Sequence, residues 1–336
     1  MRKIKIAQIG INRYSHAVDI WNTMKRQPEL FELAGYALVE GEREHFPDLL
    51  GVFDGAREMT LEQILNDPEI EAVTVETEEI HLTKYALLAA QQKKHMHMEK
   101  PGGADLAQFE QLIETVKQNR TVFHTGYMYR YNPFVTELME KIKKGELGEI
   151  FCVEAQMNCR HPAEFQQWLD TFKGGMMFFL GCHLIDLILQ IQGMPDKVLP
   201  LNRTVGTHGV TSENFGMAVL EYPHGLSFAK TCDYEIGGFE RRQLVVCGSK
   251  GSVEIKPLEA PDEDGKMHTE KREYTGDARP WSVPDKKIRS RFFGRYDDMM
   301  TSFAAMVRGE KENPYTYGYE LALYRTILKC CGVTTE

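Results

Sequence analysis

The first third of the chain alternates short apolar runs with longer segments in which apolar residues recur every three or four positions. The short runs predict buried strands, and the periodic segments predict helices. The predicted strands are 4–9, 33–39, 72–75, 94–99 and 121–126, and the predicted helices are 17–27, one that begins at Thr60, 81–93 and 105–119. Strands that alternate with helices are typical of βαβ units. The pattern therefore predicts an α/β domain with a doubly wound parallel sheet.

The pattern changes after a predicted helix at 133–144. Alternation of apolar and polar residues predicts strands at 150–157, 214–222, 226–234, 241–247 and 251–255. An apolar helix after the glycine pair in 174–192 interrupts them, the polar stretch 262–287 is expected to be a surface excursion, and helices are expected at 297–308 and 319–331. A chain of 336 residues is long for one core. We expect a parallel-sheet domain at 1–124 and an α+β domain with a large, mostly antiparallel open sheet at 125–336.

Composition and charge exclude several classes of protein. The net charge is −9, with 42% hydrophobic and 26% charged residues, which is ordinary for a globular protein and disfavours nucleic acid as a partner. No apolar run is long enough to span a bilayer, and the first apolar run ends too early for a signal peptide. The seven cysteines form no regular framework. We expect a cytoplasmic protein with reduced thiols that binds no membrane.

The turn after the first predicted strand is a candidate pyrophosphate site. A glycine turn between a strand and a helix presents backbone N–H groups and the positive end of the helix dipole to an anion. Of the G-x-G-x-x-G pattern, only Gly10 is present. Asn12 tolerates a positive φ, Arg13 could face a phosphate, and Ser15 is small enough for close packing. These four residues are the predicted cofactor contacts of the turn, although the motif is weak when taken alone.

An acidic residue, Glu40, ends the second predicted strand. A carboxylate at this place accepts hydrogen bonds from ribose hydroxyls and repels a 2′-phosphate. It therefore favours NAD over NADP. The alternative is that Glu40 and Glu42 are solvated loop charges.

The stretch HMHMEKPGG at 95–103 allows three interpretations. In a strand, His95, His97 and Glu99 share one face, as metal ligands would. His95, however, begins the strand, at the end opposite to the ligand-binding edge of a parallel sheet, and no converging cluster is evident, so we predict no metal. Lys100 lies where the strand ends, and there it could hold a substrate oxygen and stabilise developing charge. The alternative for Lys100 is an exposed loop lysine.

Four segments carry a resemblance to a known family. They are the EKP triplet at 99–101, GYMYRYNP at 126–133, the segment from Gly174 to Asp186, and GSKGS at 248–252. Their order and spacing resemble the glucose-fructose oxidoreductase, inositol dehydrogenase and rhizopine-catabolism family, called Gfo/Idh/MocA, over nearly the whole chain.

The resemblance implies a Rossmann domain followed by a large sheet that is often used for oligomerisation, here as a homodimer or homotetramer. It implies a nicotinamide cofactor and hydride transfer at a secondary alcohol of a sugar, cyclitol or related polyol. By this resemblance Lys100 orients the substrate hydroxyl and His183 is the acid/base. The implied cofactor contacts are Thr77, His81, Glu99 and Lys100.

Two functional points depart from the family pattern: the degenerate glycine turn described above and position 179. Phe179 stands where the family has an acidic residue, four positions before the histidine. Compared with the family pattern, this position therefore lacks a carboxylate and offers an aromatic ring on which a substrate could stack. Asp186 lies three residues after His183 and, on a helix, could orient its ring; alternatively, the two residues only hold that helix in place. The remaining substrate candidates are Arg130, His161 and Trp168, and for Trp168 a place in the core is equally compatible with the sequence.

Three functions are compatible with these residues. The first is an NAD-dependent dehydrogenase of a sugar or polyol alcohol. The second is an NAD-dependent glycosidase or lyase that oxidises its sugar transiently, without net redox. The third is a sensor that binds sugar or dinucleotide without turnover, which the degenerate glycine turn and Phe179 favour but Lys100 and His183 disfavour.

Overall fold

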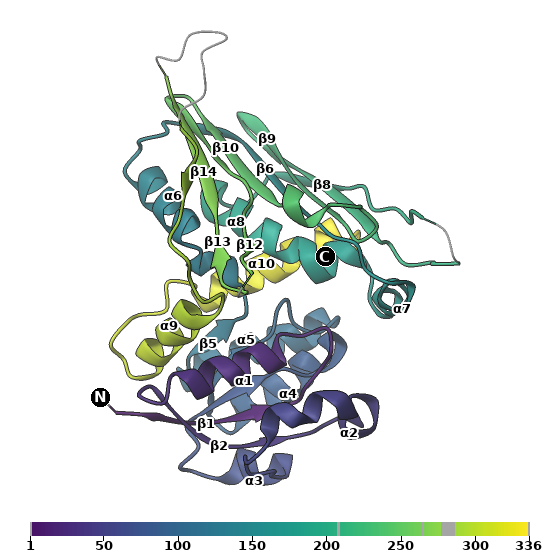
Figure 1. Cartoon of the computed structure of the whole chain (residues 1–336), viewed down its shortest axis with the longest axis vertical. Helices are drawn as coiled ribbons and strands as arrows, with labels where there is room; N and C mark the ends of the chain where they lie inside the picture. Colours follow the sequence, from purple (N-terminus) through teal and green to yellow (C-terminus); the bar gives the residue numbers. More distant parts are fainter. Residues whose placement is uncertain (1, 207–208, 264, 277–285, 335–336) are drawn as a thin grey trace. The chain divides into compact units, whose positions relative to one another are not determined.

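The computed structural model describes residues 2–206, 209–263, 265–276 and 286–334 (Figure 1). The chain forms two compact units: unit 1 comprises Met1–Tyr127 and Tyr296–Tyr324, and unit 2 comprises Met128–Arg295 and Arg325–Glu336. The single boundary predicted between 124 and 125 lies close to the first division. The return of 296–324 to unit 1 was not predicted, because apolar periodicity does not identify the surface that a helix packs on.

Unit 1 contains a five-stranded parallel sheet in the order β2-β1-β3-β4-β5. Its strands are β1 (Ile4–Ile9), β2 (Phe31–Ala37), β3 (Ala72–Val75), β4 (His95–Met98) and β5 (Phe123–Thr125). All five predicted strands are confirmed, with shifts of one to two residues at several ends. The carboxyl ends of β1 and β3 flank the point where the strand order reverses, which is the ligand-binding position of doubly wound sheets.

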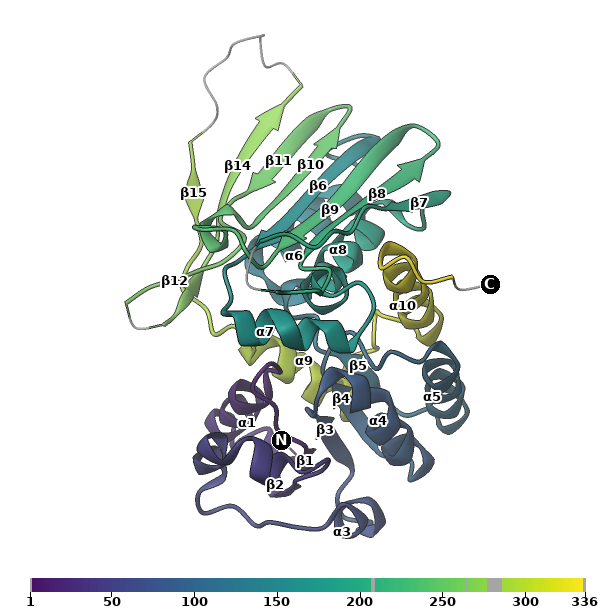
Figure 2. The same ribbon diagram turned by 90° about the vertical axis from the view of Figure 1, so that its right-hand side faces the viewer.

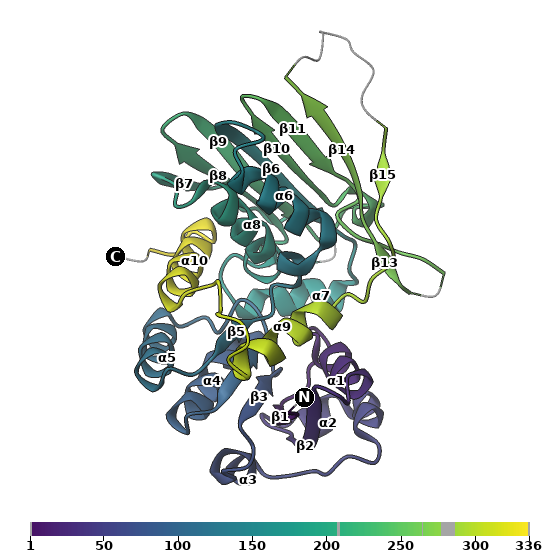
Figure 3. The ribbon, with the colours of Figure 1, turned by 90° about the vertical axis from the view of Figure 1, so that its left-hand side faces the viewer.

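The helices of unit 1 lie on both sides of this sheet (Figure 3). They are α1 (Ala17–Arg26), α2 (Glu42–His45), η1 (Pro47–Phe53), α3 (Leu61–Asn66), η2 (Glu79–His81), α4 (Leu82–Gln91), α5 (Leu106–Asn119), α9 (Asp297–Val307) and the first part of α10 (Tyr317–Cys330). The capping box of Thr60 and Gln63 is present, and Asp105 caps α5. Packing by α4 and α5 on one side and by α1 and α9 on the other explains why all four residues of β3 are buried, since strands covered on both faces lack alternation.

Unit 2 contains an eight-stranded sheet in the order β15-β14-β11-β10-β6-β9-β8-β7, in which only the β6–β9 pair is parallel (Figure 2). Its strands are β6 (Ile150–Asn158), β7 (Lys197–Pro200), β8 (Phe215–Tyr222), β9 (Gly225–Cys232), β10 (Gln243–Gly248), β11 (Gly251–Ile255), β14 (Glu270–Thr275) and β15 (Ile288–Arg289), beside a separate pair β12 (Ala260–Pro261) and β13 (Met267–His268). The predicted large, mostly antiparallel sheet is confirmed.

The helices α6 (Pro133–Lys143) and α8 (Cys182–Gln192) cover one face of the large sheet. The other helical segments of unit 2 are η3 (Met128–Tyr131), α7 (Ala163–Trp168), η4 (Leu169–Thr171), the π-helical turn η5 (Met177–Gly181) and η6 (Phe239–Arg241). In Figure 3, α6 and α8 lie side by side against the strands. The helix α8 is buried along almost its whole length, in accord with its apolar sequence.

The prediction of a surface excursion at 262–287 was wrong in part. β13 and β14 lie within it, and β14 is an inner strand of the large sheet; 264 and 277–285 lie outside the described residues. The strand β14 was not predicted because most of its residues are charged and show no apolar alternation. Lys271, for example, is buried because its ammonium binds Glu137 and Glu273 while lying over the Phe134 ring.

Candidate active site

The turn between β1 and α1 brings the chain backbone close to the end of β3. Gly10 has a φ of +89°, and a Cβ at this position would lie 2.7 Å from Thr77. A side chain is therefore excluded, which is the role of the first glycine in dinucleotide-binding turns. The Oδ1 atom of Asn12 accepts from the Tyr14 amide at 2.9 Å, whereas its Nδ2 is buried without a hydrogen-bond partner in the described part of the chain. These features fit a pyrophosphate.

The other two predicted residues of this turn have protein partners. Ser15 accepts from the Ala17 amide at 3.2 Å, and its Oγ lies 3.1 Å from the Glu76 carbonyl oxygen, so it ties the start of α1 to the end of β3. The Arg13 guanidinium binds Asp48 at 2.7 Å, on the surface. Arg13 could therefore contact a phosphate only if its guanidinium left Asp48.

Glu40 lies at the centre of a polar cluster built by α4. Its carboxylate accepts from Lys84 and from the Tyr85 hydroxyl at 2.7 Å, and His81 Nδ1 lies 3.8 Å away. The hydrogen bond from Lys84, followed by that from Tyr85, lowers the pKa of Glu40. Glu40 is therefore an ionised carboxylate oriented by two side chains of α4, although it lies in an exposed turn, as a loop charge would. His81, predicted separately, joins the same cluster.

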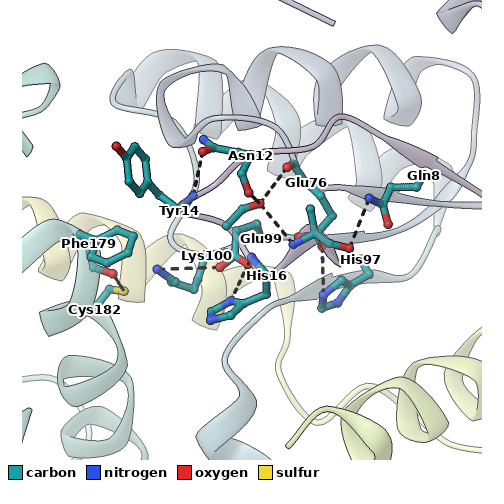
Figure 4. Close-up of polar contacts among 12 residues, drawn as sticks. Gln8, Asn12, Tyr14, His16, Glu76, His97, Glu99, Lys100, Phe179 and Cys182 are labelled. Atoms are coloured by element: carbon teal, nitrogen blue, oxygen red, sulfur yellow. Dashed lines mark hydrogen bonds and ion pairs between the residues drawn. The ribbon is translucent and has the colours of Figure 1, made fainter. Parts of the chain in front are cut away.

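Glu99 and Lys100 are buried at the carboxyl end of β4 (Figure 4). The Glu99 carboxylate accepts from the His16 backbone amide at 3.1 Å and lies 2.7 Å from His16 Nδ1. Burial alone would raise the pKa of Glu99, but the charge and hydrogen bond of His16 and the charge of Lys100 lower it to about 2. The Lys100 Nζ lies 3.8 Å from Glu99 Oε1. The alternative of an exposed loop lysine is wrong, since Lys100 is 1% exposed.

The predicted residues of unit 2 fall into two groups. In the first, Arg130 donates to both carboxylate oxygens of Asp186, at 3.0 and 2.8 Å, and Gln190 donates to Asp186 at 2.7 Å. The rings of Tyr129 and His183 meet edge to face, with centroids 5.1 Å apart. Arg130 thus holds Asp186 firmly, and orientation of the His183 ring by Asp186 stays a prediction.

The second group is aromatic. His161 stacks on Phe165 at 3.8 Å, and the rings of Phe165, Trp168 and Phe179 lie 5.2 to 5.4 Å from one another. Trp168 is half-buried, so it is not a fully enclosed core residue. Phe165 was missed from the sequence, because α7 is too short to show helical periodicity. The predicted substrate residues His161, Trp168 and Phe179 therefore all contact Phe165, which was not predicted.

A further ion-pair network surrounds Tyr129. Glu259 binds Arg242 and Arg295, and the Tyr129 hydroxyl donates to the same carboxylate. Burial favours protonation of Glu259, but the charges of Arg295 and Arg242 dominate and lower its pKa to about 2. This network fixes the position of the Tyr129 ring, which in turn contacts His183.

Two kinds of feature are not found in the described ranges. No three or more His, Cys, Asp or Glu side chains are gathered there in a way that could hold a metal ion. Within the same residues, no helix has both the length and the apolar character needed to cross a membrane.

Two family profiles match the chain. Residues 4–127 match the oxidoreductase family with an NAD-binding Rossmann fold, and 135–254 match the Gfo/Idh/MocA C-terminal domain. The chain is a member of the Gfo/Idh/MocA family of oxidoreductases. The resemblance inferred from the EKP triplet and the later segments is thereby confirmed.

Individual relatives are distant. The chain is 24% identical over 207 residues to bovine trans-1,2-dihydrobenzene-1,2-diol dehydrogenase, covering 60% of each protein. It is 28% identical over 207 residues to the Bacillus subtilis scyllo-inositol 2-dehydrogenase (NADP(+)), covering 59% of this chain and 55% of that enzyme. These alignments span less than two thirds of the relatives' length. The fold matches that of the aldose-aldose oxidoreductase from Caulobacter crescentus complexed with glycerol (TM-score 0.76, 20% identity, 98% of each chain).

Proposed function

We propose that the protein is an NAD-dependent oxidoreductase that transfers hydride between the cofactor and a secondary alcohol of a sugar, cyclitol or related polyol. The observation that carries this proposal is the buried Glu99–Lys100 pair. The Glu99 carboxylate contacts both the His16 amide at the N-terminus of α1 and the ammonium of Lys100. The pyrophosphate is expected at that N-terminus. The Gfo/Idh/MocA relatives, two of which are named as dehydrogenases of a dihydrodiol and an inositol, support the substrate class.

The chain's own residues suit this chemistry. The cofactor, when bound, supplies the hydride acceptor. The Gly10 turn and Asn12 hold its pyrophosphate, and Glu40 accepts from its adenosine ribose. Lys100 donates to the oxygen of the reacting hydroxyl and stabilises negative charge as it develops. His183 takes the hydroxyl proton.

The test is calorimetry with NAD⁺ and NADP⁺, followed by a panel of polyols and sugars monitored by NADH absorbance. Micromolar binding of NAD⁺ and sustained NADH production with one member of the panel support the proposal. Binding of neither nucleotide, by protein shown to carry none through purification, overturns it in favour of the sensor function.

Preference for NAD is a separate proposal, since the Bacillus subtilis relative is named for NADP(+). Replacing Glu40 with glutamine removes the charge that repels a 2′-phosphate and leaves Lys84 to bind one. We expect the ratio of NADP⁺ to NAD⁺ affinity to rise about 10- to 100-fold, the effect of a hydrogen bond to a charged group. The exposed Glu44→Gln is the control, and an unchanged ratio in the Glu40 variant contradicts the role of Glu40.

His183 provides a test of the acid/base assignment. We expect His183→Gln to lower kcat by about 10²- to 10⁴-fold and to remove one limb of the pH profile, while the Kd for NAD⁺ stays the same. The exposed His224→Gln should behave as wild type. A variant that keeps the complete pH profile would show that His183 only packs beside Tyr129.

A second function is favoured by Phe179. This ring belongs to the aromatic group of Phe165 and Trp168, and such faces stack on sugar rings or aglycones. An enzyme that oxidises a glycoside transiently, eliminates the aglycone and then returns the hydride would release aglycone without accumulating NADH. A glycoside panel with both products measured separates this activity from the dehydrogenase.

We also propose that the protein self-associates through the large sheet of unit 2. Large apolar side chains on its strands are exposed, namely Phe151, Leu199 and Leu226 at 45%, 43% and 56%. Light scattering distinguishes a dimer from a tetramer.

A further inference from the structure

Two glutamates that directly follow β3 are completely buried. Glu76 and Glu79 are both 0% exposed, and none of their carboxyl oxygens has a partner at hydrogen-bond geometry in the described residues. An ionised carboxylate in such a place is strongly disfavoured unless a positive charge accompanies it. The sequence around them, ETEE, looks like an exposed charged turn, so their burial requires a reason.

The groups that face Glu76 come from three elements. Burial raises the pKa of Glu76 well above its usual value, Glu99 and Glu79 raise it further, and Lys100 opposes them; Asp19 on α1 adds a smaller negative charge. Figure 4 shows Glu76 beside Glu99, with His97 below.

The histidine nearest to Glu76 supplies no positive charge. His97 Nε2 lies 3.6 Å from Glu76 Oε1, and this nitrogen is buried without a hydrogen-bond partner in the structure as described. Burial is the largest effect on His97 and lowers its pKa to about 4, so its ring is neutral near pH 7. A neutral imidazole nitrogen facing Glu76 is compatible with a protonated carboxyl group.

Glu79 has a similar environment. Burial raises its pKa to about 8; the charge of Lys100 opposes this, and Glu99 and Glu78 add to it. Near pH 7 Glu79 is therefore mostly protonated. Three carboxyl groups, those of Glu76, Glu79 and Glu99, thus share the charge of Lys100, and the ionised one is Glu99.

The position of the pair relates it to the cofactor. The pyrophosphate is expected at the Gly10 turn after β1, and Glu40 after β2 is expected to hold the adenosine ribose. A dinucleotide that crosses the sheet at the β1–β3 reversal must extend its other half over the ends of β3 and β4. Glu76 and Glu79 follow β3, and Lys100 follows β4.

We propose that Glu76 and Glu79 form a charge-compensating pair for the oxidised nicotinamide ring. Both carboxyl groups are neutral in the free protein, and one of them loses its proton to solvent when NAD⁺ binds. The uncharged ring of NADH leaves both protonated. The inference rests on the proposed cofactor and deepens it, because it assigns the site a preference for the oxidised form.

The same pair balances the proton in the reaction. If the alcohol's hydride were transferred to the bound cofactor, the positive charge of the ring would be lost, and His183 would accept the hydroxyl proton and pass it to solvent. The ionised carboxylate of the pair would then take up one proton from solvent in its place, so the site would hold the equivalent of both hydride and proton until the cofactor is oxidised again. Retention of both suits an enzyme that returns them to its substrate.

The test is calorimetry of NAD⁺ and NADH binding at pH 7 in phosphate and in Tris, whose different ionisation enthalpies report protons released. For the wild type we expect close to one proton released per NAD⁺ and none per NADH, with the release declining above about pH 8 as Glu79 ionises in the free protein. Glu76→Gln and Glu79→Gln mimic the protonated acids and should fold normally. In at least one of them we expect the release to disappear and NAD⁺ to bind roughly tenfold more weakly, equivalent to one pKa unit, with NADH affinity unchanged.

The half-buried Glu78→Gln is the matched control and should release the proton as the wild type does. Equal proton release with NAD⁺ and NADH, or a release that persists in both variants, overturns the charge-compensating pair while leaving the proposed function intact. If neither NAD⁺ nor NADH binds, the proposed function is overturned, and the charge-compensating pair is overturned with it.

Discussion

Replacing Lys100 with methionine should reduce kcat about 10³- to 10⁴-fold, because a buried ammonium that stabilises developing charge acts where solvent screening is weak. Methionine keeps most of the side-chain volume and removes the charge. Lys100 is 1% exposed, and its Nζ lies 3.8 Å from Glu99. The effect is expected in kcat rather than in cofactor affinity, since Glu99 and the Gly10 turn remain. Steady-state kinetics and NAD⁺ calorimetry measure the two separately.

The exposed Lys117→Met on α5 is the control for removal of a lysine charge and should retain full activity. A circular dichroism melt establishes that the Lys100 variant is folded. Turnover within tenfold of the wild type in folded Lys100→Met would show that the lysine has only a structural role beside Glu99.

Local sequence signals predicted local structure well. The capping box at Thr60 and Gln63, the Asp105 cap and the strand 251–255 each depend on a few neighbouring residues, and all are present. The family signature likewise placed Lys100 at the end of β4. Such features need no knowledge of what packs against them.

Partners distant in the chain could not be predicted in this way. The Glu99 carboxylate binds His16, 83 residues earlier, because the N-terminus of α1 and the end of β4 meet at one edge of the sheet. The burial of Glu76 and Glu79 has the same origin. In unit 2 the pairing of Arg130 with Asp186 was also missed, although both residues were singled out. Each of these contacts depends on the register and order of strands, which single-sequence patterns leave open.

The Arg130–Asp186 pair gives the largest expected effect on stability. The two side chains are 0% and 1% exposed, and the guanidinium binds both carboxylate oxygens. Removing the arginine leaves the buried Asp186 carboxylate, to which Gln190 donates, without its bidentate ion pair. We expect Arg130→Met to lower the free energy of unfolding by about 3–5 kcal/mol, measured by urea denaturation.

The double variant Arg130→Met, Asp186→Leu separates the cost of an unpaired charge from the cost of lost packing. Because apolar residues of similar size often replace a buried ion pair without loss, we expect the double variant to recover most of the stability of the wild type. Arg2→Met, which removes an exposed pair with Glu71, should change stability by about 1 kcal/mol or less. If the double variant is as unstable as Arg130→Met, the guanidinium contributes through contacts other than Asp186. Recovered stability combined with lost turnover would instead mean that the pair positions α8, and therefore His183, for the reaction.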